Sequence, residues 1–323
     1  MKRRLQFFLL IISVVLVGIS CNAPRTNPLD PLNPDYNYGT IEGTVLTIGI
    51  PSFEISDVKV LWENANLITE TDANGRFRLN NIPIKDGDII FSKDGYKPET
   101  LSVAWGSSKR YISLTFLNRI PTLDTVSIYT IIKYDFFPLQ SELFVKAWIT
   151  DLDRDVDSVF VVNETLNLRK PLTYLAAEGN YQTTIMESEL NVNDIEQTIG
   201  LDFSIIAKDR SVPPNEFIIG SDRITRVIKD EITELHPSTD STVTSQPVIF
   251  NWNEFEAGYD FSYLIEVFSL SSFQLVYTQT NISSDSISYS LPQNLTNGSY
   301  YWVIWIVDQF QNRSRSKPAH FRI

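Results

Sequence analysis

The chain has 323 residues, of which 27 are Lys or Arg and 39 are Asp or Glu, so its formal net charge is −12. This acidic balance disfavours nucleic acid as a partner, because affinity for phosphates comes mainly from Lys and Arg. It also disfavours electrostatic attachment to anionic lipid. With 43% hydrophobic residues and a single cysteine, the chain must hold its domains together by packed cores, without an internal disulfide.

Residues 1–20 have the pattern of an export signal. A basic head at residues 2–4 precedes an almost wholly apolar stretch at residues 5–17, and small residues then lead to Cys21. Such an order predicts export and cleavage. The apolar stretch is shorter than the roughly 20 residues that span a membrane. The alternatives are an ordinary secretory signal with an incidental cysteine, or an uncleaved anchor helix.

The position of Cys21 resembles the lipobox of bacterial lipoproteins. Ser20 directly before it fits that pattern, whereas Gly18 stands where the family usually has leucine. The resemblance implies that diacylglycerol is attached to the thiol, that palmitate labels the protein, and that cleavage leaves Cys21 as the first residue. Several acyl chains anchor a protein stably, since each buried CH₂ adds about 0.8 kcal/mol. Asn22 is not the aspartate typical of inner-membrane retention, so we expect a cell-envelope location at the outer membrane.

Residues 21–39 are expected to form a proline-rich tether. Prolines at positions 24, 28, 31 and 34 fix φ and remove backbone donors. Extended chain of this kind rises about 3.1 Å per residue and acts as a spacer. Loss of residues 1–20 would remove three basic residues and no acidic one, which moves the net charge from −12 to −15.

From residue 40 onward, apolar and polar residues alternate over short runs, and turn residues separate these runs. This pattern predicts half-buried strands. We therefore expect an all-β protein with three tandem β-sandwich domains, at residues 40–118, 119–231 and 232–323. The segment from Met186 to Gln197 comes nearest to a helix, but it is too polar for a core helix and is expected to be a short surface turn.

The domain at 40–118 carries the most specific signals. Its strand VKVLW places Val58, Val60 and Trp62 on one face, and TDANG supplies the left-handed backbone that a hairpin turn needs. The segments IEGTV, TDANGRFRLNNIP and DGYKPE resemble the carboxypeptidase regulatory-like domain, a transthyretin-like sandwich. That resemblance implies an accessory module without catalytic residues. The sequence has no cluster of His and Glu that would make the zinc-peptidase site of the enzymes after which the family is named.

The domain at 119–231 is expected to be an immunoglobulin-like sandwich. Its run LFVKAWI places Leu143, Val145, Ala147 and Ile149 on one face of a strand. An acidic turn then leads to a second strand, and FSIIAKD follows as a further one. This likeness concerns the class of fold and names no family.

The domain at 232–323 resembles fibronectin type III. Trp252 stands where that family has its core tryptophan, and Leu295, Gly298 and Tyr301 have the family's L-x-x-G-x-x-Y spacing. Tyr301 is therefore our candidate for the tyrosine corner, in which the hydroxyl bonds to nearby backbone. Two strands are expected to point alternate residues inward, namely Val248, Phe250 and Trp252, and Tyr263, Ile265 and Val267.

Two tryptophans are expected to face outward. Trp148 lies opposite the apolar face of its strand, and Trp302 lies opposite Trp305, which is expected to be core. Exposed aromatic residues stack on sugar rings or anchor protein partners, so Trp148 and Trp302 are candidate binding residues. The alternative is packing against a neighbouring domain or a second sheet.

One motif is a candidate metal site. The turn DLDRDVD carries Asp151, Asp153, Asp155 and Asp157 at alternate positions, and such hard oxygen ligands suit calcium. It is not an EF-hand, because valines occupy the places of the required Gly and Glu. The alternative is a solvated turn between two strands.

No motif indicates catalysis. The chain has two histidines, His236 and His320, and neither has the local context of a catalytic triad. Walker, dinucleotide-binding and HExxH motifs are absent from the sequence. We therefore expect no enzyme activity, no catalytic residue and no cofactor other than calcium. A pair of carboxylates that cleaves glycosidic bonds is the least favoured alternative.

These features together predict an envelope-anchored lipoprotein that acts as a non-catalytic binding or scaffold module. It would contact the membrane through its N-terminal lipid and recognise a protein or glycan partner, but no nucleic acid. The alternatives are a polysaccharide-binding lipoprotein of a glycan-uptake system and an accessory subunit of secretion or envelope assembly.

Overall fold

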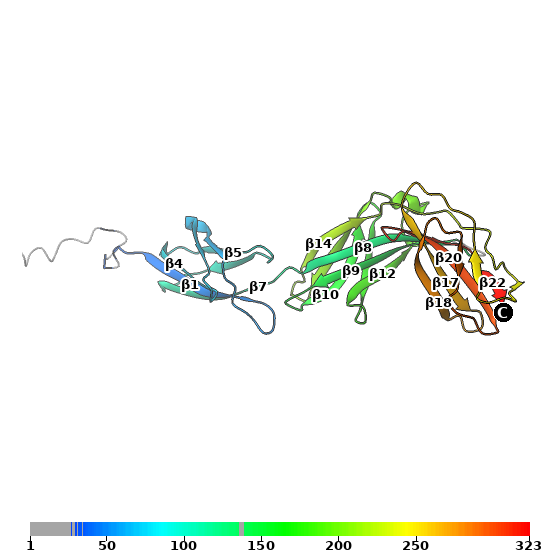
Figure 1. The fold of residues 1–323 in the computed structure, drawn as a ribbon. Helices are drawn as coiled ribbons and strands as arrows, with labels where there is room; N and C mark the ends of the chain where they lie inside the picture. The colour runs from blue at the N-terminus through cyan, green and yellow to red at the C-terminus, as the bar shows by residue number, and fades with distance from the viewer. Residues whose placement is uncertain (1–26, 28–29, 31, 34, 136–138) are drawn as a thin grey trace, which may run out of the picture. The chain divides into compact units, whose positions relative to one another are not determined.

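The computed structural model describes residues 27, 30, 32–33, 35–135 and 139–323. The expected signal peptide, Cys21 and much of the tether lie outside these residues. The chain forms two compact units, and the boundary between them lies between Arg119 and Ile120. Figure 1 shows strands throughout the described parts, with no α-helix among them, which confirms the all-β expectation. In the same parts, no helix has the length and apolar character needed to cross a membrane.

The first unit is a sandwich of two sheets, ordered β4-β1-β7 and β3-β2-β5-β6. Its strands are β1 (Tyr38–Thr47), β2 (Lys59–Trp62), β3 (Leu67–Glu70), β4 (Arg76–Pro83), β5 (Gly87–Ser92), β6 (Glu99–Val103) and β7 (Arg110–Leu117). A short 3-10 turn, Glu63–Ala65, connects β2 to β3.

The core of the first unit confirms the inward face expected for β2. Val58, Val60 and Trp62 are all buried. The ring of Trp62 meets that of Trp105 edge to face, with centroids 6.5 Å apart. Aromatic pairs of this geometry add to the burial of their area.

The TDANG segment forms a turn, but not the turn of a hairpin. Asp72 Oδ1 accepts hydrogen bonds from the amides of Asn74 and Arg76, each at 2.9 Å, and Gly75 has φ +69°. The flanking strands β3 and β4 belong to different sheets, so the turn carries the chain from one sheet to the other. The hydrogen bonds from the amides to Asp72 fix the turn locally. The strands on either side of it do not pair with each other: β3 pairs with β2, and β4 pairs with β1.

The second unit contains two sandwiches. The first has the sheet order β14-β13-β10-β11 on one side, and β12-β9-β8 on the other. β11 links the two sides, because its first half pairs with β10 and its last residues pair with β12. The strands are β8 (Thr122–Lys133), β9 (Gln140–Thr150), β10 (Val156–Asn163), β11 (Leu168–Leu175), β12 (Asn180–Met186), β13 (Asp202–Asp209) and β14 (Glu216–Arg223).

The inward face expected for β9 is confirmed, since Leu143, Val145 and Ala147 are fully buried and Ile149 packs against them. Between β12 and β13 the chain makes two 3-10 turns, Glu187–Glu189 and Ile195–Thr198, where a short surface turn was expected. Ile195 of the second turn is buried in the same core. The polar segment therefore contributes two buried apolar residues, Leu190 and Ile195, and forms no α-helix.

The second sandwich of this unit packs a main sheet, β21-β20-β17-β18 with β22 also on β20, against the pair β16-β19. Its strands are β15 (Ser241–Thr242), β16 (Ile249–Asn251), β17 (Phe261–Ser269), β18 (Leu275–Ser283), β19 (Ser288–Ser290), β20 (Ser299–Asp308), β21 (Arg313–Arg315) and β22 (Ala319–Arg322). The expected inward residues of the strands around β16 and β17 are all buried, which confirms those two faces; they are Val248, Phe250, Trp252, Tyr263, Ile265 and Val267.

The expected orientation of β20 is wrong by one residue. Tyr300 is buried, and its hydroxyl donates to the carbonyl of Thr296 at 2.9 Å, so Tyr300 and not Tyr301 makes the bond of a tyrosine corner. Trp302, expected to face outward, is fully buried in the sandwich core. Its indole Nε1 donates to the carbonyl of Pro237 at 2.9 Å. β20 is apolar on both faces, so alternation could not tell the two faces apart.

Candidate binding site at the sandwich junction

One short strand joins the two sandwiches of the second unit. β21 pairs with β20 of its own sandwich and, in parallel, with the end of β8, where Arg313 lies beside Ile131 and Arg315 beside Lys133. A single sheet therefore continues from β9 and β8 through β21 into β20 and β17. This backbone pairing fixes the relative position of the two sandwiches.

An apolar cluster lies against the joined sheet. Tyr129 and Ile131 of β8 pack with Val303 and Trp305 of β20, and all four are buried. The indole Nε1 of Trp305 donates to Glu266 Oε2 at 2.8 Å, so its one polar group is satisfied. Four partly buried residues complete this junction cluster, namely Phe144, Leu264, Phe268 and Val307.

A buried polar network centres on Asp308, at the turn between β20 and β21. Its side chain is 0% exposed, and its Oδ2 accepts a hydrogen bond from Arg226 Nη1 at 2.8 Å. Its Oδ1 accepts from the amides of Phe310 and Asn312, each at 2.9 Å. Asn312 in turn accepts at Oδ1 from the Thr130 amide at 2.9 Å. The network thus ties the turn to β8 of the other sandwich.

The linker between the sandwiches is bonded to the same place. Ser314 Oγ donates to the carbonyl of Asp230 at 2.7 Å, and the Tyr134 hydroxyl donates to the carbonyl of Lys229. The Arg226 guanidinium lies 3.8 Å from the ring centroid of Tyr259. Because the Arg226 guanidinium is both stacked on Tyr259 and paired with the buried Asp308 carboxylate, its position is closely constrained.

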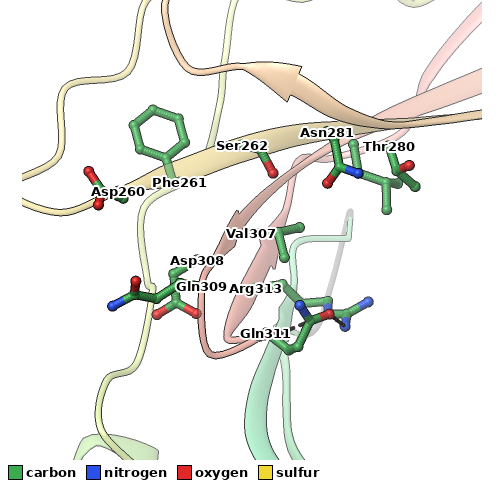
Figure 2. A pocket seen from close by; sticks show the side chains of 11 residues that line it. Asp260, Phe261, Ser262, Thr280, Asn281, Val307, Asp308, Gln309, Gln311 and Arg313 are labelled. Carbon is green, nitrogen blue, oxygen red and sulfur yellow. Dashed lines mark hydrogen bonds between the residues drawn. The ribbon is translucent and has the colours of Figure 1, made fainter.

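A pocket of about 310 Å³ lies beside this junction. Three chain segments line it, as Figure 2 shows: the start of β17, the end of β18, and the β20–β21 turn with Arg313. Arg313 Nη2 donates to Gln311 Oε1 at 3.3 Å across its rim. The lining residues are Asp260, Phe261, Ser262, Leu264, Thr280, Asn281, Val307, Asp308, Gln309, Gln311 and Arg313.

The chemistry of the pocket is that of a hydrogen-bonding site. Asp260, Asn281 and Gln309 are exposed at its edge and offer a carboxylate and two amides, while Val307 supplies an apolar patch between them. The Asp308 carboxylate is already occupied by the bonds described above. Sequence reasoning missed this pocket, because its residues come from strands far apart in the chain. The only signal was the polar turn DQFQN directly after a buried strand.

One of the four aspartates organises the backbone of the acidic turn. Asp151 accepts hydrogen bonds at Oδ1 from the amides of Asp153 and Arg154, at 3.1 and 3.0 Å, and at Oδ2 from the Val156 amide at 2.8 Å. Asp157 is exposed on β10 and accepts from its neighbour Ser158. Asp151 therefore acts at least in part as the cap of the turn.

The pKa of Asp155 is raised to about 6, first by burial and then by the negative charges of Asp151, Asp209 and Asp153. Asp209 was not foreseen; it lies at the end of β13, where it pairs with Val156 of β10. Within the described ranges, no group of three or more His, Cys, Asp or Glu side chains has an arrangement that could hold a metal ion. Calcium binding by Asp151, Asp153, Asp155 and Asp157 stays a prediction.

The two aromatic candidates differ. Trp148 lies on β9 beside Thr125 of β8 and is half-buried, so part of its ring is accessible. Trp302 is a core residue, and the expectation that it faces outward is wrong. Trp302 lies in the sandwich core because it belongs to the inward face of β20, together with Tyr300 and Ile304.

The two histidines are held in structural positions. The backbone of His236 pairs with Asn251, and the ring of His320, in β22, lies 5.9 Å from that of Tyr301. Neither histidine lines the pocket at the junction. The candidate lipidation site, Cys21, lies outside the described residues.

No protein-family model matches the chain, and no curated protein matches it. Among solved structures it is similar to the major pilin subunit of Bacillus cereus, with 10% identity and a TM-score of 0.28 over 88% of this chain and 95% of that one. The FN1-FN3 domains of chicken CNTN1 match with 10% identity and a TM-score of 0.31, over 81% and 89% of the two chains. The fibronectin(III)-like modules of Clostridium thermocellum CbhA match with 11% identity and a TM-score of 0.30, over 63% and 93%. Likeness this distant assigns no function.

Proposed function

We propose that the chain is a non-catalytic binding or scaffold protein of the cell envelope, anchored by a lipid on Cys21. The observation that carries the proposal is the sheet that continues from β8 through β21 into β20. It turns two sandwiches into one rigid body with fixed surface loops. A rigid binding surface loses little conformational freedom when a partner binds, which favours affinity.

The chemistry at the junction supports a role without catalysis. The buried carboxylate of Asp308 is neutralised by Arg226 and holds a turn. The other ionisable groups of the pocket are Asp260, exposed at its edge, and Arg313, which is bonded to Gln311. A hydrolase that acts through paired carboxylates would need one group held protonated and one ionised beside the bond it cleaves.

The anchor has a direct test. Radiolabelled palmitate should enter the wild-type protein and not the Cys21→Ala variant, and the mature N-terminus should map to residue 21. An unlabelled wild-type protein, or a mature terminus elsewhere, would remove the lipid anchor and the outer-membrane location from the proposal. It would leave the binding role of the rigid unit untouched.

A protein partner should be recovered by crosslinking in intact membranes followed by purification of the full chain. We expect one or a few envelope proteins in constant ratio to the chain. Trp148→Ala should lower this recovery, whereas Phe273→Ala, which removes an exposed aromatic ring from the other sandwich, should not. A partner set made of secretion or envelope-assembly components would assign the chain to that machinery. Recovery of no protein would count against the scaffold role.

Glycan binding is the second candidate, and the pocket at the junction favours it. Amide and carboxylate groups around an apolar patch suit the hydroxyls and the faces of a sugar ring. In affinity electrophoresis on a panel of polysaccharides, the wild-type chain should be retarded by at least one. Gln309→Ala should abolish the retardation, while Gln293→Ala, an exposed amide outside the pocket, serves as the matched control. Unchanged mobility on every polysaccharide would exclude this candidate.

Calcium remains a proposal for the acidic turn, supported by the raised pKa of Asp155, which comes from burial and then from the repulsion of the neighbouring carboxylates. A bound cation would relieve this repulsion. The melting temperature should then rise when calcium replaces chelator, and Asp153→Asn should remove the rise. Equal melting temperatures in calcium and in chelator would contradict calcium binding by the acidic turn.

A further inference from the structure

In the edge strand β7 of the first unit, apolar side chains face outward and polar side chains face the interior, which is the reverse of the usual arrangement. Ile112, Leu114 and Phe116 face outward and are 65%, 60% and 42% exposed. Between them, Ser113 and Thr115 face the interior and are buried, and their hydroxyls have no hydrogen-bond partner among the described residues. A buried hydroxyl without a hydrogen-bond partner costs free energy. A one-residue shift in the register of β7 would exchange its two faces and bury the apolar side chains instead. The strand therefore retains an arrangement that does not serve the fold of its own unit.

The backbone of the same three residues points to an open edge. The carbonyls of Lys109 and Leu117 accept hydrogen bonds from the β1 side, namely from the amides of Thr40 and Ile48. Because direction alternates along a strand, the amides and carbonyls of Ile112, Leu114 and Phe116 point away from β1. Within the described parts of the chain, β7 ends the sheet order β4-β1-β7, and no strand pairs with this side.

The usual protection against pairing is absent between Tyr111 and Phe116, and only beyond them does the segment at Tyr96 and Lys97 bond to Asn118 and Arg119. Sheet edges in soluble proteins carry a lysine, a proline or a bulge that blocks a further strand. The interior of β7, from Tyr111 to Phe116, contains no charged residue and no proline. Its register with β1 is continuous over eight residue pairs, without a bulge. Between Tyr111 and Phe116 the edge is therefore apolar and regular, and a further strand can pair with it.

We propose that β7 pairs with β7 of a second copy of this chain, so that two three-stranded sheets form one six-stranded sheet. In an antiparallel arrangement centred on Leu114, each Leu114 lies opposite its counterpart and each Ile112 lies opposite Phe116 of the other copy. Cross-strand apolar pairs of this kind stabilise a sheet. The pairing extends from Ile112 to Phe116 and stops before Arg110 and Asn118, because the Asn118 carbonyl already accepts from the Lys97 amide and the backbone of Arg110 is bonded to Ser108.

The charge of the surrounding surface also favours a second copy. The hollow beside β7 is lined by three acidic residues, Glu42, Glu70 and Asp72, and three basic ones, Arg76, Arg78 and Arg110. Glu42 forms ion pairs with both Arg78 and Arg110. This face is thus locally neutral in a chain whose net charge is −12. Two copies of this face do not repel each other, whereas a strongly charged partner would meet no surface of opposite charge here.

Cysteine crosslinking tests the register. The full-length chain with Cys21→Ser has no thiol, so every crosslink must come from an introduced residue. Leu114→Cys should form a disulfide-linked dimer on mild oxidation, because opposite residues of paired strands lie within disulfide reach. Ile112→Cys alone should not form one, but Ile112→Cys together with Phe116→Cys should. Thr44→Cys, on the same face of the neighbouring strand β1, is the matched control and should stay monomeric.

Oligomeric state gives a second, independent measurement. Light scattering of the Cys21→Ser chain in mild detergent should show a concentration-dependent dimer. Leu114→Lys should raise the dissociation constant at least about tenfold, while Ile287→Lys, at a residue 54% exposed in the other unit, should leave it unchanged. A monomer at every concentration, or equal crosslinking of Leu114→Cys and Thr44→Cys, would overturn the proposal. Capture of a different polypeptide by the Leu114→Cys thiol would overturn it too. Neither result bears on the lipid anchor.

Discussion

Strands β20 and β7 both carry apolar side chains on the face that points away from their own sandwich core. In β20 these residues, Val303 and Trp305, are buried against Tyr129 and Ile131 of the neighbouring sandwich. In β7 the equivalent residues are more than two-fifths exposed. The same sequence feature therefore has a partner within the chain in one place and none among the described residues in the other.

The difference teaches how an apolar outer face should be interpreted. A strand with one solvated face must be polar there, so continuous apolar character predicts a second covering surface. For β20 that surface is the sandwich joined through β21, and the two sandwiches belong to one compact unit. For β7 the missing cover is the basis for proposing a second copy of the chain.

The largest expected effect is at the junction cluster. Trp305→Ala removes a large side chain that is 8% exposed and should lower the free energy of unfolding of the second unit by about 3 kcal/mol. Because the two sandwiches then share less surface, chemical denaturation should change from one transition to two. Ile68→Ala, at an exposed residue of β3, is the control and should change the free energy of unfolding of its own unit by less than about 0.5 kcal/mol.

A second variant breaks the polar part of the junction. Asn312→Ala leaves the buried Thr130 amide without its acceptor and removes a donor to Asp308. Leaving such groups unsatisfied should cost about 2 kcal/mol. Urea denaturation measures the loss, and hydrogen exchange at the Thr130 amide should become faster. An unchanged exchange rate would mean that the network does not hold β8 to the turn.

A third experiment sharpens the assignment of the two faces of β20. Tyr300→Phe removes the hydroxyl that donates to Thr296 and should cost about 1 kcal/mol. Tyr301→Phe should cost almost nothing, since Tyr301 is half-buried and its ring contacts, with Phe268 and His320, do not need the hydroxyl. If the two substitutions had the same effect on the unfolding free energy, the orientation of the strand would need revision.

These cases show where sequence reasoning succeeds and where it fails. The inward faces of β2, β9 and β17 were predicted because each strand has one polar face, which gives its alternation a direction. In β20 the run YYWVIWIV is apolar throughout, and the choice of Tyr301 over Tyr300 rested on a spacing rule alone. Both faces of this strand are buried, so hydrophobicity held no information about which face points inward.

The junction and the pocket were beyond prediction for a different reason. Asn312 bonds to Thr130, which is 182 residues away in the chain, and no local pattern links the two. The pocket likewise draws on three separate segments. The acidic turn was visible as a motif, but the contribution of Asp209 depends on the pairing of β10 with β13. Local composition predicts elements and turns, whereas sites made by pairing between distant strands need the fold.

The inner face of β7 gives a smaller effect of opposite sign. Thr115→Val keeps the shape of the side chain and removes a buried hydroxyl that has no partner among the described residues. The substitution should stabilise the first unit by about 1 kcal/mol. Thermal denaturation of the full chain, followed at the transition of that unit, gives the value. A loss of stability would show that the Thr115 hydroxyl has a hydrogen-bond partner. The buried polar face of β7 would then cost the first unit less free energy than we infer.

The smallest expected effect concerns Asp155, a partly exposed residue whose buried Oδ1 has no partner among the described residues. Its pKa is about 6 in the folded chain against an ordinary 3.8. The folded state therefore holds this proton more tightly than the unfolded state, and the stabilisation it gives is present below pH 3.8 and lost as the pH rises through about 6. Asp155→Asn cannot ionise, so it should match the wild type at low pH.

At neutral pH the same variant should be more stable than the wild type, because it carries no repelled charge. The group is partly exposed, so solvent screening limits the gain to about 1 kcal/mol or less. Urea denaturation of both proteins at several values of pH measures the difference. Because every other carboxylate is common to the two chains, a difference that does not grow between pH 4 and pH 7 would mean that Asp155 is solvated, and that the acidic turn, unlike β7, hides no unsatisfied polar group.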